Sequence, residues 1–95
     1  MALLQVPVHP GEILKEEFLQ PLDLSAGRLA RHIHVPRTRI ERLIKGETAM
    51  TIDTATRLAR AFGTTPQFWM NLQLAHDLLT APPLDVDTIT PLVAA

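Results

Sequence analysis

The sequence contains no cysteine and no tyrosine, and it has only one serine, Ser25. Without cysteine there is neither a disulfide framework nor a thiolate metal site, which is compatible with a reducing cytosol. The four histidines follow no metal-binding spacing such as HxxxH, and no glycine-rich phosphate loop is present. We therefore expect no catalytic activity, no cofactor and no bound metal.

Long apolar runs and export signals are also missing. No apolar run approaches the roughly 18 residues that a membrane-spanning helix needs, and the N-terminus has no basic segment with a cleavage pattern. Of the 95 residues, 46% are hydrophobic, which suits one globular domain with a modest core. These features predict a cytoplasmic protein without a membrane partner.

Positive charge is scarce at both ends of the chain and concentrated in its middle. The formal net charge is −1, but residues 28–60 carry eight lysine and arginine side chains against three acids. Residues 1–27 and 61–95 each sum to −3. A basic middle favours a polyanion-binding face, although a solvated arginine-rich surface would give the same counts.

The stretch 24–46, LSAGRLARHIHVPRTRIERLIKG, predicts two short helices joined by a sharp turn. Ser25 is the expected N-cap of the first helix, and Pro36 is expected at the first position of the second. His34 lies where the turn requires a left-handed backbone, and Gly46 closes the second helix. Two apolar seams mark the buried faces: Leu29, Ala30 and Ile33, then Ile40, Leu43 and Ile44.

The second of these helices carries polar side chains on the arc that faces away from its apolar seam. At about 100° per residue, five positions share this arc. They are Arg37, Thr38, Glu41, Arg42 and Lys45. Long cations with an acceptor and a hydroxyl are what a helix uses to read the major groove of DNA. The segment therefore predicts a helix-turn-helix.

The side chains of this arc have expected roles on duplex DNA. Arg37 and Arg42 suit bidentate reading of guanine edges. Glu41 suits cytosine N4, and Thr38 suits a thymine methyl or a phosphate. Other cations are expected on phosphates, which position the protein without specifying a sequence: Arg28, Arg31, Arg39 and Lys45. Because one short helix touches few base pairs, two copies about 34 Å apart across a palindrome are expected.

Three further helices are expected around this motif. One begins at His9–Pro10 and stops at Pro21, one runs from its cap Thr51 to Gly63, and the last begins at Thr65. Their buried positions are expected at Ile13, Leu14, Phe18 and Leu22; at Ile52, Ala55, Leu58, Ala59 and Phe62; and at Phe68, Leu72, Ala75 and Leu79, with Trp69 and Leu78 beside the last set. The sequence thus predicts an all-α bundle of five helices.

The chain changes character after Leu79. The segment Ala81-Pro82-Pro83 is a stiff break, and alternating apolar and acidic residues follow. We expect a DNA-binding domain over residues 1–80 and an extended C-terminal arm over residues 81–95, with one short strand as an option. Because a lone strand has no partner in a helical monomer, the arm is a candidate dimer contact, and a frayed tail is the alternative.

The stretch SAGRLARHIHVPRTRIERLIKG resembles the helix-turn-helix of phage-repressor (Cro-type, or XRE) regulators. Around it, HPGEILKEEFLQPLDLS, TIDTATRLARAFGTTPQFW and FWMNLQLAHDL are similar to the HigA family of antitoxins, over residues 8–79. The resemblance implies a dimeric, phage-repressor-like protein that binds operator DNA, represses its own operon and neutralises an mRNA-cleaving HigB-type toxin. It places DNA contacts at Pro36, Arg37, Thr38, Glu41, Arg42 and Lys45.

Two positions depart from the family's pattern. Ala26 stands where many of these regulators have a phosphate-contacting glutamine, and His34 replaces the usual turn glycine. The alternatives are a stand-alone XRE regulator without a toxin, a protein-binding adaptor in which the polar arc is incidental, and a small hydrolase. If a toxin partner exists, the acidic side chains of the first helix are a candidate surface for it: Glu12, Glu16 and Glu17.

Overall fold

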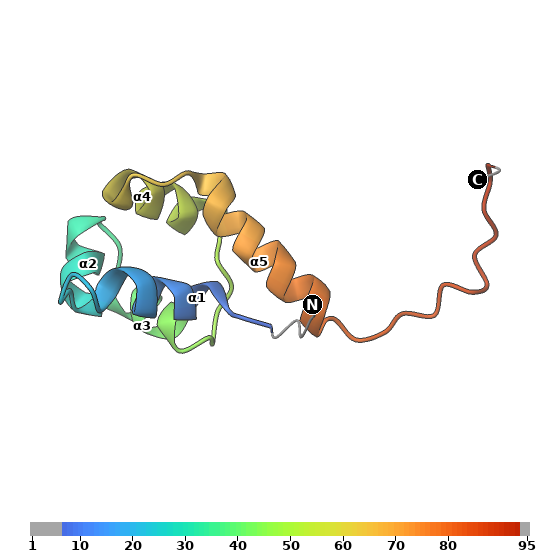
Figure 1. Ribbon diagram of the computed structural model, residues 1–95, viewed down its shortest axis with the longest axis horizontal. Helices are drawn as coiled ribbons and strands as arrows, with labels where there is room; N and C mark the ends of the chain where they lie inside the picture. Colours follow the sequence, from blue (N-terminus) through green and yellow to red (C-terminus); the bar gives the residue numbers. More distant parts are fainter. Residues whose placement is uncertain (1–6, 94–95) are drawn as a thin grey trace.

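Six helical segments follow one another along residues 7–93, the part of the chain that the computed structural model describes (Figure 1). They are α1 (Pro10–Ile13), the π-helix η1 (Leu14–Leu19), α2 (Ala26–His32), α3 (Arg37–Ile44), α4 (Ile52–Phe62) and α5 (Pro66–Thr80). Because η1 continues α1 directly, the five expected helices are all present, and the all-α class is confirmed.

The first helix begins with α geometry and continues as a π-helix. His9 caps it, since its Nδ1 accepts a hydrogen bond of 2.9 Å from the backbone N–H of Gly11. In η1 the backbone hydrogen bonds span five residues, so residues five apart share a face. Leu14 and Leu19 are buried for this reason. Leu22, which was expected in the core, is 59% exposed because it lies in the turn beyond the widened helix.

The helix-turn-helix is formed by α2 and α3. The Ser25 hydroxyl accepts a hydrogen bond of 3.1 Å from the backbone N–H of Arg28, as expected of an N-cap. His34 has the expected left-handed backbone, with φ of 64°, and Gly46 follows α3 with φ of 74°. The expected place of Pro36 was wrong by one position: its ψ of 145° is extended, so Pro36 is the N-cap and the helix begins at Arg37.

The core lies where α2 and α3 meet the other helices. Each of the six helical segments contributes at least one of its largest fully buried side chains: Pro10, Leu14, Leu29, Ile40, Leu43, Leu58 and Trp69. Both predicted seams of the helix-turn-helix are therefore confirmed, with Ile44 half-buried at the edge. Burial on both helices fixes how α3 is mounted on the rest of the molecule.

Helix α4 is bounded as its sequence predicts. The Thr51 hydroxyl caps it through the backbone N–H of Thr54, and Gly63 ends it in the left-handed conformation, with φ of 70°. Ala55, Leu58 and Ala59 are buried as expected, and Phe62 is half-buried. Ile52 is 70% exposed, against expectation, because it lies at the first helical position and at the edge of the buried face.

Helix α5 packs against the core through a different stripe from the expected one. Trp69 is fully buried and Gln73 is 6% exposed, whereas Phe68 is 37% exposed and Leu78 is 73% exposed. Ala75 and Leu79 are exposed too, and Leu72 is half-buried. The buried line thus runs one position later than predicted, and the end of α5 projects beyond the other helices (Figure 1).

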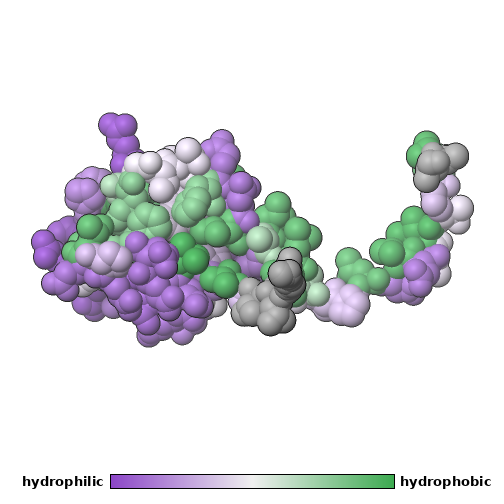
Figure 2. Space-filling model, in the orientation of Figure 1, coloured by the Kyte–Doolittle hydropathy of each residue, from purple (hydrophilic) through white to green (hydrophobic). Residues whose placement is uncertain are grey.

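Residues 81–93 extend away from the helices as an arm, which carries exposed apolar side chains (Figures 1 and 2). These are Leu84, Val86, Ile89, Leu92 and Val93. The arm is extended as predicted, but it forms no strand within its described residues, because no second strand lies beside it. Among the helices of residues 7–93, none has the length and apolarity needed to cross a membrane.

Candidate nucleic-acid interface

Helix α3 is held by its buried face and presents its polar arc outward. Ile40 is fully buried and Leu43 is 2% exposed. Four members of the expected arc are exposed: Arg37, Thr38, Arg42 and Lys45. Glu41 is half-buried. The structure therefore brings the predicted base-reading side chains together on one exposed side of a fixed helix, and Pro36, also exposed, lies at its beginning.

Two members of the arc form an ion pair along the helix. Nε of Arg37 lies 3.2 Å from Oε2 of Glu41, and the two side chains are 70% and 40% exposed. Pairs at i and i+4 in such exposure are weak and are screened by salt. The pair orients both side chains in the free protein, and it can be exchanged for contacts with a base at little cost.

The first turn of α2 lies directly beside the beginning of α3. A Cβ placed on Gly27 would be 3.1 Å from Cδ of Arg37, so the two helices meet there. Arg28 and Arg31 are exposed on α2, and neither is paired with an acid among residues 7–93. The beginning of α2 therefore lies beside Arg37, whereas Arg28 borders a different pocket, which it lines with Ala61 and Phe62 of α4.

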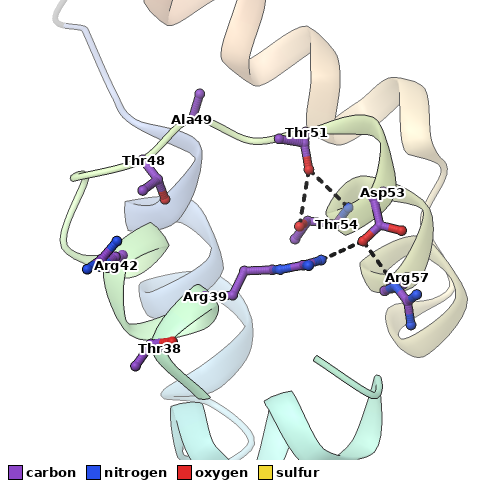
Figure 3. Close-up of a pocket in the computed structure, with 9 residues that line it drawn as sticks. All are labelled: Thr38, Arg39, Arg42, Thr48, Ala49, Thr51, Asp53, Thr54 and Arg57. Carbon is purple, nitrogen blue, oxygen red and sulfur yellow. Dashed lines mark hydrogen bonds and ion pairs between the residues drawn. The ribbon is translucent and has the colours of Figure 1, made fainter. Parts of the chain in front are cut away.

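Arg39 is engaged with another helix, which the sequence does not predict. Figure 3 shows its guanidinium reaching from α3 to Asp53, where Nη1 donates a short hydrogen bond to Oδ2. The same oxygen accepts a hydrogen bond of 3.1 Å from Nε of Arg57, whose Nη1 also donates to the backbone oxygen of Ile33 at 2.9 Å. One network therefore links α3, α4 and the turn of the helix-turn-helix.

The carboxyl of Asp53 is kept ionised by its two partners. The hydrogen bond from Arg39, and then that from Arg57, lowers the pKa of this carboxyl from its ordinary value of 3.8. The side chains of Asp53 and Arg39 nevertheless remain 55% and 42% exposed. An ion pair with that much contact with water contributes little net stability.

A polar pocket of about 530 Å³ opens between α3, the loop that follows it and the beginning of α4 (Figure 3). It is lined by Thr38, Arg39, Arg42, Thr48, Ala49, Thr51, Asp53, Thr54 and Arg57. Three guanidinium groups and several hydroxyls are donors of the kind that phosphate oxygens accept from. The pocket shares Thr38 and Arg42 with the predicted base-reading arc, so it borders the face that would meet DNA.

Of the residues outside α3 that line this pocket, sequence reasoning identified only Thr51, and that as a helix cap. The spacing of Asp53 and Arg57, four residues apart on one helix, was a readable signal for their pairing. No pattern in the sequence signalled the contact of Arg39 with Asp53, fourteen positions away. Among residues 7–93, no three histidine, aspartate or glutamate side chains are grouped so that they could hold a metal.

A fixed helix that presents exposed polar side chains, preceded by a sharp turn and a second helix, and bordered by a cationic pocket, defines a protein of the helix-turn-helix class. The profile of the helix-turn-helix family matches residues 14–69, which include the complete motif and α4. The family match and the structure therefore identify the same helices as the functional unit.

Relatives of known name narrow this class further. Virulence-associated protein I of Dichelobacter nodosus is 49% identical over 74 residues, which are 78% of this chain and 68% of that protein. The structure of the Pseudomonas aeruginosa antitoxin HigA with the higBA promoter gives a TM-score of 0.78 at 43% identity, over 80% of this chain and 83% of that one. That of the antitoxin GraA in complex with its operator gives a TM-score of 0.83 at 38% identity, over 99% of both chains. The chain belongs to the helix-turn-helix family and, within it, to the HigA antitoxins.

Proposed function

We propose that this protein is a cytoplasmic, DNA-binding antitoxin that inserts α3 into the major groove of operator DNA, represses its own operon and neutralises an mRNA-cleaving toxin of the HigB type. The observation that carries the proposal is the outward polar arc of α3 on a buried mount, in a chain 43% identical to an antitoxin solved with a promoter. We further propose that it has no catalytic activity of its own.

The residues of the interface divide into two groups in this proposal. Arg37, Thr38, Glu41 and Arg42 read base edges, and Pro36 sets where their helix begins. Arg28, Arg31, Arg39 and Lys45 contact phosphates. Support comes from the exposure of all these side chains except Glu41, and from the position of α2 beside the beginning of α3.

Gel-shift or anisotropy measurements with the operator, at two salt concentrations, test the two groups separately. Arg42→Ala should cost roughly 1–3 kcal/mol of binding free energy and relax the choice of sequence. Arg39→Ala should weaken binding to all sequences and reduce the salt slope by up to about one unit. Lys15→Ala, an exposed cation on η1, is the matched control. If both interface variants bind like the wild type at both salt concentrations, the assignment is wrong.

We propose that residues 1–80 form the DNA-binding domain and that residues 81–95 contribute to a homodimer, as two copies are needed for a palindromic operator. Support comes from apolar side chains that the helical body leaves exposed: Leu74, Leu78 and Leu79 on α5, and Leu84, Val86 and Ile89 on the arm. Deletion of residues 82–95, followed by light scattering, should reduce the mass to that of a monomer. An unchanged oligomer would remove the arm from the interface.

The structure gives less evidence for a toxin-binding surface than for the DNA-binding and dimer surfaces. The acidic side chains Glu12, Glu16 and Glu17 are all exposed, and they form a candidate surface for a basic partner. Co-expression with the adjacent gene, followed by pull-down, tests whether a toxin binds. Retention of operator binding without any such partner would favour the second candidate function, a stand-alone transcriptional regulator of the same fold.

A further inference from the structure

Asp53 is the one acid among the nine residues that line the pocket beside α3. Its carboxylate accepts hydrogen bonds from two of the three arginines in that lining, Arg39 and Arg57 (Figure 3). A carboxylate and a phosphate offer a guanidinium the same kind of acceptor oxygens. Asp53 therefore occupies the donors that a DNA phosphate at this pocket would need.

The ion pair of Arg39 and Asp53 is not what holds α3 against the rest of the fold. Both side chains are about half exposed to solvent, where such a pair is weak. Helix α3 is held instead by fully buried side chains, among them Ile40, with Ala55 and Leu58 of α4 in the same core. The main effect of Asp53 is consequently on the charge of the pocket, not on the position of the helix.

The two arginines are not equivalent in their attachment. Arg57 is held by two nitrogens of its guanidinium, because Nε donates to Asp53 and Nη1 donates to the backbone oxygen of Ile33 at 2.9 Å. Arg39 has Asp53 as its ion-pair partner and lies next to Thr38, on the exposed side of α3. Arg39 can therefore leave Asp53 for a phosphate while Arg57 continues to neutralise the carboxylate.

We propose that Asp53 is a positioning residue that acts through Arg39: it holds this arginine in the DNA-free protein and competes with the DNA phosphate for it. The inference rests on the DNA-binding function proposed above and assigns a regulator of its phosphate contacts. Phosphate contacts supply essentially all of non-specific binding. Asp53 thus weakens attachment to DNA of any sequence, so that a larger share of operator binding comes from the base-reading arc.

The test measures binding to a random-sequence duplex and to the operator over a series of salt concentrations. Asp53→Asn frees Arg39 for phosphate, so the plot of log K against log salt should become steeper by whatever part of about 0.9 units Arg39 does not already contribute in the wild type. A gain of the whole 0.9 units would make binding to both duplexes about eightfold tighter at 0.1 M salt, for equal affinities at 1 M salt, so the expected gain is at most about eightfold. Asp53→Glu keeps the carboxylate and should retain the wild-type slope. Glu17→Gln, which removes the same charge from exposed η1, controls for net charge.

A second background separates competition from a structural effect. In an Arg39→Gln chain the cation that Asp53→Asn would release is missing, so the added substitution should change the slope by clearly less than it does in the wild type. Asp53→Ser should reproduce the result of Asp53→Asn, and circular dichroism reports whether each variant is folded.

The outcomes distinguish this inference from the function on which it rests. If the wild type binds DNA and Asp53→Asn binds it more weakly, or with an unchanged slope, Asp53 is no competitor and the inference fails alone. An equal change of slope with and without Arg39 also overturns it. If the wild type binds neither duplex at any salt concentration, the proposed function fails and takes this inference with it.

Discussion

Substitution of Gly11 by alanine tests how closely the first helix approaches α3. Gly11 is buried in α1, and a Cβ built on it would lie 1.7 Å from the backbone oxygen of Leu43 and 2.6 Å from the carbonyl carbon of that residue. Because the obstacle is main chain, no side-chain rotation relieves it. The alanine therefore forces α1 away from α3 by an amount on the order of an ångström.

The expected loss of stability follows from two opposing contributions. Overpacking a well-packed site costs typically about 1–3 kcal/mol, and a main-chain obstacle belongs at the upper end of that range. Alanine returns at most about 1 kcal/mol through its higher helix propensity. The net loss in the free energy of unfolding is then about 2 kcal/mol, which lowers the melting temperature by roughly 8–16 °C for a domain of this size.

Thermal unfolding followed by circular dichroism measures this loss, and Gly27→Ala is the matched control. A Cβ on Gly27 would meet only Cδ of Arg37, at 3.1 Å, and that flexible side chain can move aside. Gly27→Ala should therefore melt at or above the wild-type temperature, by up to about 1 kcal/mol of added stability. If Gly11→Ala also melts at or above the wild type, the argument from close approach is refuted.

Three further substitutions address single interactions. Burial and the neighbouring His76 lower the pKa of His9 below 6.5, so its contribution to stability is complete above pH 6.5 and is lost as pH falls through the lowered pKa. In urea unfolding at a series of pH values, His9→Asn should remove this fall in the free energy of unfolding, and an unchanged fall would exclude His9 as its source. Gln73→Leu leaves the buried N–H of Met50 without its acceptor, now 2.6 Å away, and should cost about 1–3 kcal/mol in urea unfolding; an unchanged stability would contradict the need for this acceptor. His34 has a left-handed backbone, so His34→Gly should raise the melting temperature slightly, and a marked decrease would show that the imidazole has a role in the turn.

The ends of the helices could be predicted because capping is local. Ser25, Thr51 and Thr65 each accept a hydrogen bond from the backbone three residues on, and Gly63 ends α4 with a left-handed backbone. These contacts depend only on neighbours in sequence, so residue type and spacing indicate them. The same locality made the turn of the helix-turn-helix predictable, including the conformation of His34.

The buried stripe of α5 could not be chosen from the sequence. Two stripes one position apart are both apolar, and the one that is buried passes through Trp69 and includes a glutamine, Gln73. Gln73 is buried because its side chain accepts from Met50 and donates to Asp77, partners that only the assembled fold brings near. A period of 3.6 residues indicates that a face is buried, but the neighbouring helices decide which one.

The change to π geometry in the first helix was also beyond the sequence. No cap, proline or glycine marks Leu14, where η1 begins, so the regular helical period predicted buried positions as far as Leu22. The need for glycine at position 11 has a similar cause, since it is set by the main chain of Leu43. Both features come from the packing of one helix on another.

The candidate interface was predicted in part. The outward arc of α3 follows from the spacing of its apolar residues, and the structure places it as expected. The roles of the individual side chains on DNA remain predictions. The partner of Arg39 could not be predicted, because Asp53 lies on another helix and their contact depends on the angle between α3 and α4.

The burial of Trp69 makes the state of the core visible in ultraviolet light. It is the single tryptophan of the chain, it has no exposed surface, and its indole N–H donates to the Thr64 hydroxyl at 2.8 Å. Its ring packs against Phe18 and Phe68, with ring centroids 5.1 and 5.0 Å apart. Its fluorescence emission should therefore be blue-shifted in the native protein and move to longer wavelength when α5 leaves the core, giving every variant an intrinsic reporter that needs no label.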